Sequence, residues 1–166
     1  MEIERKFLVK DISGIDLSKY SRKQIVQDYL YKDLYTIIRK RKIIKDDNEI
    51  YKYTIKTDKN GVAVNEIEKE ITKSDYDMLK TIEDYNTINK TIYIIPIEND
   101  LEIELDIFHD KFEGIIFAEV EFKDEKQANE FKAPDWFDKE ITTEITNADM
   151  ATMTVDSIFE IISKYN

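Results

Sequence analysis

The sequence predicts an α+β protein in which eight antiparallel strands close into a barrel with a charged interior, with a few helices packed against it. Two observations predict this class. Eight segments rich in β-branched and aromatic residues follow one another, separated by turn signals such as the run 58–61, Asp-Lys-Asn-Gly. Charged and apolar residues alternate in most of these segments, and most segments carry mainly one sign of charge. Alternation alone fits any antiparallel sheet with one solvated face. Charges sorted by sign favour a closed barrel with a polar interior.

The elements follow from the pattern of each segment. We expect strands at residues 1–9, 24–33, 35–44, 49–57, 62–71, 87–96, 101–108 and 115–123. We expect helices at 75–84, where Ser74 can cap the first turn, and at 124–132. A last helix begins near Thr146, which has capping-box spacing to Asp149. No repeat or linker divides the chain, so we expect one domain over residues 1–166.

Composition excludes several classes of function. The chain of 166 residues has a net charge of −11, which argues against sequence-independent binding to nucleic acid or to an anionic membrane. It has no cysteine, which excludes disulfides and thiolate metal sites, and its one histidine, His109, leaves little scope for imidazole chemistry. With no apolar run of about 18 residues and no signal-peptide layout, we expect a cytoplasmic protein. A homodimer is one assembly that we keep open.

The charged faces are the candidate functional surface. Acidic faces are carried by Glu2 and Glu4 (with Lys6), by Glu66, Glu68 and Glu70, by Glu102, Glu104 and Asp106, and by Glu119 and Glu121. Basic faces are carried by Arg39 and Arg41 and by Lys52 and Lys56. Converging Arg and Lys side chains can hold phosphates, and clustered carboxylates can bind Mg²⁺ or Mn²⁺. Together they indicate metal-assisted phosphoryl chemistry.

The motifs of these segments resemble those of one known family, in the same order and along nearly the whole chain. The opening run Glu-Ile-Glu-Arg-Lys, residues 2–6, is similar to the Glu-x-Glu-x-Lys signature of the CYTH domain, or triphosphate tunnel metalloenzymes. Further matches are the Gln-x-Tyr-Leu run at 27–30, Arg-x-Arg at 39–41, Thr-x-Lys at 54–56, Glu-x-Glu within 65–70, Glu-x-Asp-x-Phe at 104–108, Ala-Glu-Val-Glu-Phe at 118–122, Pro-x-Trp at 134–136 and Glu-Ile-Thr at 140–142.

The resemblance implies an eight-stranded triphosphate tunnel that works with Mg²⁺ or Mn²⁺, and it implies roles for individual residues. The phosphate ligands would be Lys6, Arg39, Arg41, Lys52, Lys56 and Lys90. The metal ligands would be Glu2, Glu4, Glu119 and Glu121, with Glu68, Glu70, Glu104 and Asp106 nearby. The catalytic set would be Lys6, Arg39, Arg41 and Glu119.

Three departures from the family pattern leave the substrate open. Val64 and Ile92 stand where the family often has arginine, and the segment 143–146 lacks the arginine expected there. We expect a metal-dependent triphosphatase acting on inorganic tripolyphosphate. The alternatives are a nucleoside or thiamine triphosphatase, an adenylyl cyclase of the class IV type, and a weakened polyphosphate- or nucleotide-binding module without catalysis.

Overall fold

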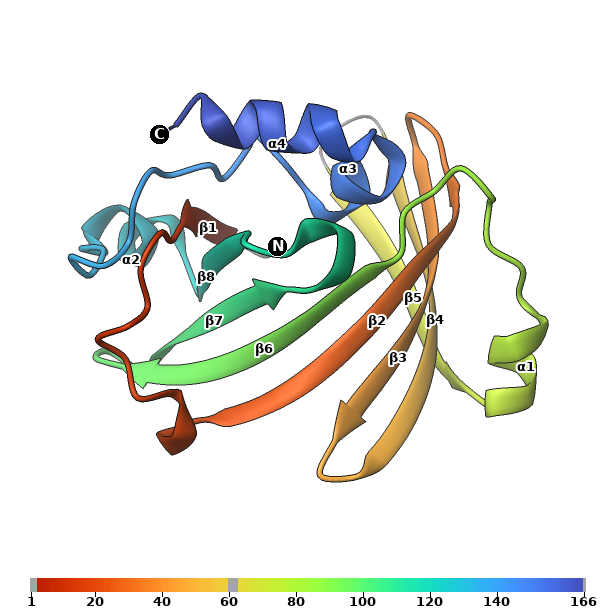
Figure 1. Cartoon of the computed structure of the whole chain (residues 1–166), viewed down its shortest axis with the longest axis horizontal. Helices are drawn as coiled ribbons and strands as arrows, with labels where there is room; N and C mark the ends of the chain where they lie inside the picture. The colour runs from red at the N-terminus through yellow and green to blue at the C-terminus, as the bar shows by residue number, and fades with distance from the viewer. Residues whose placement is uncertain (1–2, 60–62, 166) are drawn as a thin grey trace. The chain divides into compact units, whose positions relative to one another are not determined.

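The computed structural model describes residues 3–59 and 63–165, with the backbone alone at 58, 59, 63 and 64. Its strands are β1 (Ile3–Leu8), β2 (Ser21–Lys32), β3 (Thr36–Lys45), β4 (Asn48–Lys59), β5 (Ala63–Ile71), β6 (Ile88–Ile97), β7 (Leu101–Phe108) and β8 (Ile116–Phe122). Its helices are α1 (Lys73–Met78), α2 (Glu125–Glu130), α3 (Asn147–Thr152) and α4 (Val155–Ser163) (Figure 1). No helix among the described residues is long and apolar enough to cross a membrane.

The strands of the described residues form an antiparallel sheet that does not close, so the predicted closed barrel is wrong. The hydrogen-bonded order is β1-β8-β7-β6-β2-β3-β4-β5, with β1 and β5 at its two ends. The outer edge of β1 is already occupied: the amides of Leu8 and Ile141 donate to the carbonyls of Lys139 and Lys6. The segment around Glu140 thus takes the place that a closing strand would need. Charge alternation could not reveal this, because an open sheet and a closed one share the same side-chain period.

The chain divides into two compact units, and the first comprises residues 1–23 and 90–145. It contains β1, β8, β7 and most of β6. Odd-numbered positions of β7, among them Leu105, point into an apolar core together with Phe7 of β1 and Val120 of β8. Helix α2 covers this core through Ala128. Because successive side chains of a strand point to opposite faces, the charged residues Glu104 of β7 and Glu119 of β8 are left on the other face.

The second unit comprises residues 24–89 and 146–166, with β3, β4, β5 and most of β2. Tyr51 on the apolar side of β4 packs against Tyr76 of α1, with ring centroids 4.9 Å apart. Lys40 reaches the carbonyls of Tyr76 and Leu79 at 3.0 and 2.8 Å. These contacts fix α1 on the face opposite Arg39 and Arg41 of β3, whose side chains alternate with Lys40.

The helix predictions need two corrections. Helix α1 begins after Thr72, not Ser74, because the Thr72 side chain accepts the Asp75 amide, and it ends at Met78 well before the predicted residue 84. The predicted last helix is two helices, because Thr154 accepts the amide of Ser157 and starts a second one. The capping box of Thr146 and Asp149 at the start of α3 is confirmed.

We expect Thr146→Ala to lower the free energy of unfolding by about 1 kcal/mol. The Thr146 hydroxyl accepts the Asp149 amide at 3.0 Å, and alanine leaves that amide without this acceptor. Urea unfolding measures the change. Ser163→Ala, at the exposed end of α4, is the control and should stay within about 0.5 kcal/mol of the parent. Equal losses in both variants would contradict the role of the capping box.

Candidate active site

Carboxylates gather on the polar face of the first unit. The antiparallel register places Lys6 opposite Glu119 and Glu119 opposite Glu104, so one row of charge crosses β1, β8 and β7. Glu4 lies opposite Glu121. A cavity of about 200 Å³ is lined by Glu4, Asp100, Glu102, Glu104, Glu119 and Glu121. Carboxylate oxygens are the ligands that hard divalent cations prefer. Among the described residues, no three Asp, Glu or His side chains lie close enough together to hold a metal ion as they stand.

The cavity disfavours the ionised form of one of its carboxyls, that of Glu104. Burial, and then the charge of Glu119, raise the pKa of the Glu104 carboxyl, although Lys23 and Lys90 oppose the shift. A carboxyl with a raised pKa is one that would gain from a nearby cation. The donor chemistry of this cavity therefore fits a divalent metal.

We expect Glu104→Gln to stabilise the metal-free protein increasingly as the pH rises from 4 to 8. The folded protein holds the Glu104 proton to higher pH than the unfolded chain does, because its pKa is raised. Stability is therefore lost as the pH climbs from the ordinary carboxyl pKa to the raised one, and it stays lost above that. Glutamine removes this loss. The unfolding temperatures of the variant and the parent, measured in chelator across this pH range, give the difference. An increase in unfolding temperature at pH 4 equal to that at pH 8 would contradict a raised pKa of Glu104 as the cause.

Two buried lysines of the first unit are paired with carboxylates. Lys6 Nζ lies 3.2 Å from Glu119 Oε1, and it also donates to the Ile145 carbonyl at 3.3 Å. Lys90 Nζ lies 2.6 Å from Asp106 Oδ2. Asp106 is completely buried, and burial raises its pKa to about 7 although Lys90 opposes the shift. Both ammonium groups are thus held in place on the charged face by protein acceptors.

The second unit gathers basic groups around one glutamate. Arg41 and Lys52 reach Glu68 at 2.8 and 3.0 Å, and the Thr54 hydroxyl donates to it at 3.2 Å. Burial, and then the neighbouring charge of Arg39, lower the pKa of Arg41. The Nε atoms of Arg39 and Arg41 are buried and have no hydrogen-bond partner among the described residues. Two guanidinium groups with buried unused donors on a basic face form an arrangement that suits an anion.

The structure brings most of the predicted residues together within each unit. Glu4, Glu104, Glu119 and Glu121 line one cavity. Arg39, Arg41, Lys52 and Lys56 share one face with Glu66, Glu68 and Glu70, since the register pairs Lys52 with Glu70, Thr54 with Glu68 and Lys56 with Glu66. Asp106 is buried beside Lys90 and does not line the cavity. Glu2 and the side chain of Val64 lie outside the described residues.

Sequence reasoning missed one cavity residue and left another undecided. Asp100 lines the cavity from the turn between β6 and β7, where its backbone φ is +56°. The signal was available, because aspartate is frequent in turns with this conformation. Glu102 has the parity of the acidic face, but parity alone could not place it in the cavity rather than at its rim. His109 contacts the Thr91 hydroxyl at 2.7 Å and does not line the carboxylate cavity.

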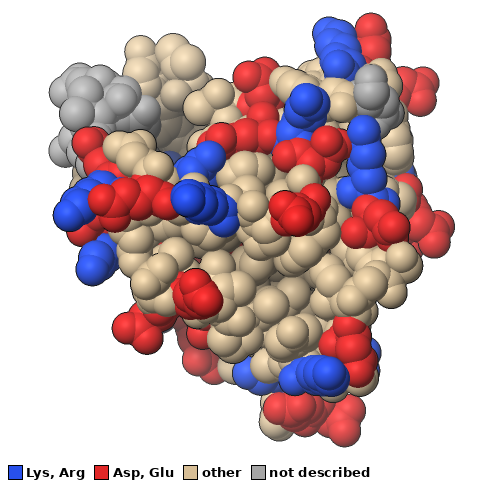
Figure 2. Space-filling model, turned by 90° about the vertical axis from the view of Figure 1, so that its left-hand side faces the viewer, with Lys and Arg blue, Asp and Glu red and all other residues tan. Residues whose placement is uncertain are grey.

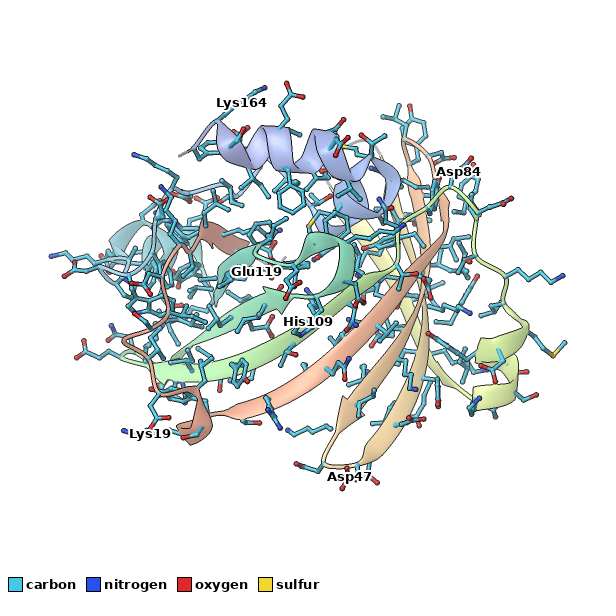
Figure 3. All side chains as sticks on the ribbon, in the orientation of Figure 1. Lys19, Asp47, Asp84, His109, Glu119 and Lys164 are labelled. Atoms are coloured by element: carbon cyan, nitrogen blue, oxygen red, sulfur yellow. The ribbon has the colours of Figure 1, made fainter. Side chains whose placement is uncertain are left out.

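Part of the molecular surface carries charges of both signs side by side. On the face of the molecule in Figure 2, acidic and basic side chains lie next to one another around an uncharged centre. Glu119 on β8 and His109 after β7 are labelled in Figure 3, which shows the sticks along the strands.

A β-sheet that carries a carboxylate cavity and buried cationic side chains has the groups that a protein needs to bind both a metal ion and phosphates. An inorganic triphosphatase of Nitrosomonas europaea is 29% identical over 141 residues, which cover 85% of this chain and 89% of that protein. An inorganic triphosphatase of Acetivibrio thermocellus is 30% identical over 144 residues, 85% of each chain. A crystal structure of an inorganic triphosphatase aligns with a TM-score of 0.68 at 27% identity, covering 93% of this chain and 96% of the other. No protein-family model matches the chain.

The chain belongs to the CYTH family of triphosphate tunnel metalloenzymes. The resemblance drawn from the sequence motifs is confirmed at this level.

Proposed function

We propose that this protein hydrolyses inorganic tripolyphosphate with the help of Mg²⁺ or Mn²⁺. The proposal is carried by one arrangement in each unit, a carboxylate cavity in the first and anion-binding guanidinium groups in the second. The first unit has a cavity walled by carboxylates, and the second has adjacent guanidinium groups with buried unused donors. The two relatives named inorganic triphosphatases support the inorganic substrate over a nucleotide.

The cavity carboxylates are the groups that would hold the metal. Glu4, Glu104, Glu119 and Glu121 offer oxygen ligands from three neighbouring strands. When bound there, a divalent cation would supply charge neutralisation for the phosphates and would lower the pKa of a bound water. We leave Asp106 out of this set because it is fully buried beside Lys90. Glu68 and Glu70 are also left out, because Glu68 pairs with Lys52 and Glu70 lies opposite that lysine.

The cationic side chains would bind the phosphates by exchanging partners. Lys6 is paired with Glu119, and both Arg41 and Lys52 with Glu68. A phosphate oxygen can replace each carboxylate with a charge-assisted hydrogen bond of similar strength. Each replacement frees a carboxylate, and those of the cavity become available to a cation. Hydrolysis then requires attack of water on a terminal phosphorus, with a cavity carboxylate accepting the proton. The bond from that phosphorus to the bridging oxygen breaks, so that orthophosphate and pyrophosphate are released.

The test is phosphate release from a panel of tripolyphosphate, ATP, GTP and thiamine triphosphate, with Mg²⁺ or Mn²⁺ and with chelator. We expect metal-dependent release from tripolyphosphate well above release from the other three. Preferential release from an organic triphosphate would overturn the inorganic substrate. If nothing is released but tripolyphosphate raises the unfolding temperature, the protein is a binding module and the proposed hydrolysis is wrong.

A further inference from the structure

One carboxylate of the second unit holds two cations at once. Arg41 of β3 donates a hydrogen bond to Glu68 Oε2 at 2.8 Å, and Lys52 of β4 donates one to Glu68 Oε1 at 3.0 Å. The hydroxyl of Thr54, a fully buried residue, donates to Glu68 Oε2 at 3.2 Å. Both oxygens of this carboxylate are therefore engaged, and two of these three donors are cationic.

The two cations converge on Glu68 although they would otherwise repel each other. Arg41 and Lys52 lie directly opposite each other on β3 and β4, a position in which like charges are unfavourable. The residue of β5 opposite Lys52 is Glu70, yet the Lys52 ammonium pairs with Glu68. Arg39 adds positive charge, because it lowers the pKa of Arg41 as the largest cause after burial. Glu68 is thus the anion that holds Arg41 and Lys52 together.

Solvent reaches this cluster of charges. The side chains of Arg41, Lys52 and Glu68 are 18%, 31% and 27% exposed. Ion pairs in contact with water are weak, because water screens the attraction between the charges. An anion from solution can therefore approach both cations and compete with Glu68 for them. A polyphosphate is well suited to this, since its oxygens form strong charge-assisted hydrogen bonds with guanidinium and ammonium groups.

We propose that Glu68 is an internal competitor of the substrate, whose carboxylate occupies the position of a phosphate between Arg41 and Lys52. The substrate must displace this carboxylate in order to bind, and its return helps to expel the phosphate product. The inference rests on the proposed function, in which Arg41 and Lys52 are phosphate ligands. Glu68 then weakens the binding of phosphate anions even without a metal ion. An ordinary ion pair would contribute only stability, and a metal ligand would act only when the cation is present.

The binding of anions to Glu68→Gln and to the parent, measured in chelator, tests this. We expect the Kd for tripolyphosphate and the Kd for pyrophosphate each to fall by about tenfold, since two exposed ion pairs no longer compete with the ligand. Isothermal titration calorimetry measures both constants. At one fixed concentration, tripolyphosphate should also raise the unfolding temperature of the variant by more than that of the parent.

Glu49→Gln is the matched control. Glu49 of β4 pairs with Lys42 of β3 at 3.0 Å. Because Lys42 alternates with Arg41 along β3, this pair lies on the opposite face of the sheet. The variant removes the same charge and breaks an ion pair of the same unit, so its Kd values should match those of the parent.

Three results would overturn the inference. The first is unchanged or weaker binding of tripolyphosphate by Glu68→Gln. The second is an equal gain of affinity in Glu49→Gln, which would assign the effect to net charge. The third is an effect of Glu68→Gln that appears only with Mn²⁺, which would make Glu68 a metal ligand.

A second variant covers the case in which Glu68→Gln does not fold. Glu68→Asp withdraws the carboxylate by one methylene, and it should lower both Kd values by a smaller factor. A parent protein that neither hydrolyses nor binds tripolyphosphate would refute the proposed function. An active parent whose Glu68 variants gain no affinity refutes only the role of Glu68.

Discussion

Glu119→Gln should lower kcat/KM for tripolyphosphate by about 100-fold. Glu119 occupies the middle of the row that joins Lys6, Glu119 and Glu104, and it lines the carboxylate cavity. The amide keeps the volume but loses a negative charge that both Lys6 and a divalent cation would use. Metal affinity should fall together with turnover, and the half-saturating Mn²⁺ concentration should rise.

Steady-state kinetics over a Mn²⁺ series measures this change. Glu113→Gln is the control, because Glu113 is exposed in the turn before β8 and lies outside the cavity. It should match the parent in both kcat/KM and metal requirement. A Glu119→Gln protein with normal metal requirement and normal turnover would remove Glu119 from the site.

Arg41→Gln should raise KM for tripolyphosphate by about 10- to 150-fold, since a hydrogen bond to a charged group contributes about 1.5–3 kcal/mol. Arg41 is half-buried beside Arg39, and its Nε has no hydrogen-bond partner among the described residues. Its one ion-pair partner among those residues, Glu68, also holds Lys52, so the loss of Arg41 leaves Glu68 paired. The effect should therefore appear in substrate binding more than in stability.

The adjacent residue of β3 offers a matched control. Lys42 points to the opposite face, where it pairs with Glu49 at 3.0 Å. Lys42→Gln removes the same charge from the same strand, and it should leave KM unchanged. Equal increases in KM for both variants would mean that net charge, and not the placement of Arg41, governs the affinity. Increasing salt should weaken the binding of the parent, since the contacts are ionic.

The sequence predicted which side chains share a face, because the period of a strand is two. It therefore placed Arg39 with Arg41, and Glu119 with Glu121, on the correct faces. It could not predict which strands would be neighbours. The pairing of Lys6 with Glu119 joins residues more than a hundred positions apart in the chain, and single-strand patterns carry no signal for such pairing.

The motif at 140–142 did not indicate that the segment 138–142 pairs with β1. Those residues show no alternation, yet their backbone bonds to β1 and occupies the edge that closure would have needed. Asp106 illustrates a different limit. Its parity matches that of Glu104, but depth within the sheet separates a buried partner of Lys90 from a cavity carboxylate. Whether a residue is odd- or even-numbered in its strand predicts the face to which its side chain points, but it does not predict how deeply that side chain is buried.

The bonding of β1 has a consequence for how the chain acquires its structure during synthesis. β1 precedes all its partners, because one edge pairs with β8 and the other with the segment around Glu140. The ion pair of Arg5 with Glu140 joins residues 135 positions apart. Such long-range contacts form late and slow the folding of a domain. The nascent β1 must therefore wait for a strand partner until β8 has left the ribosome, and its outer edge waits longer, until the segment around Glu140 has emerged. Alternating charges, which β1 carries at Glu4 and Lys6, disfavour the aggregation of a strand that is still unpaired.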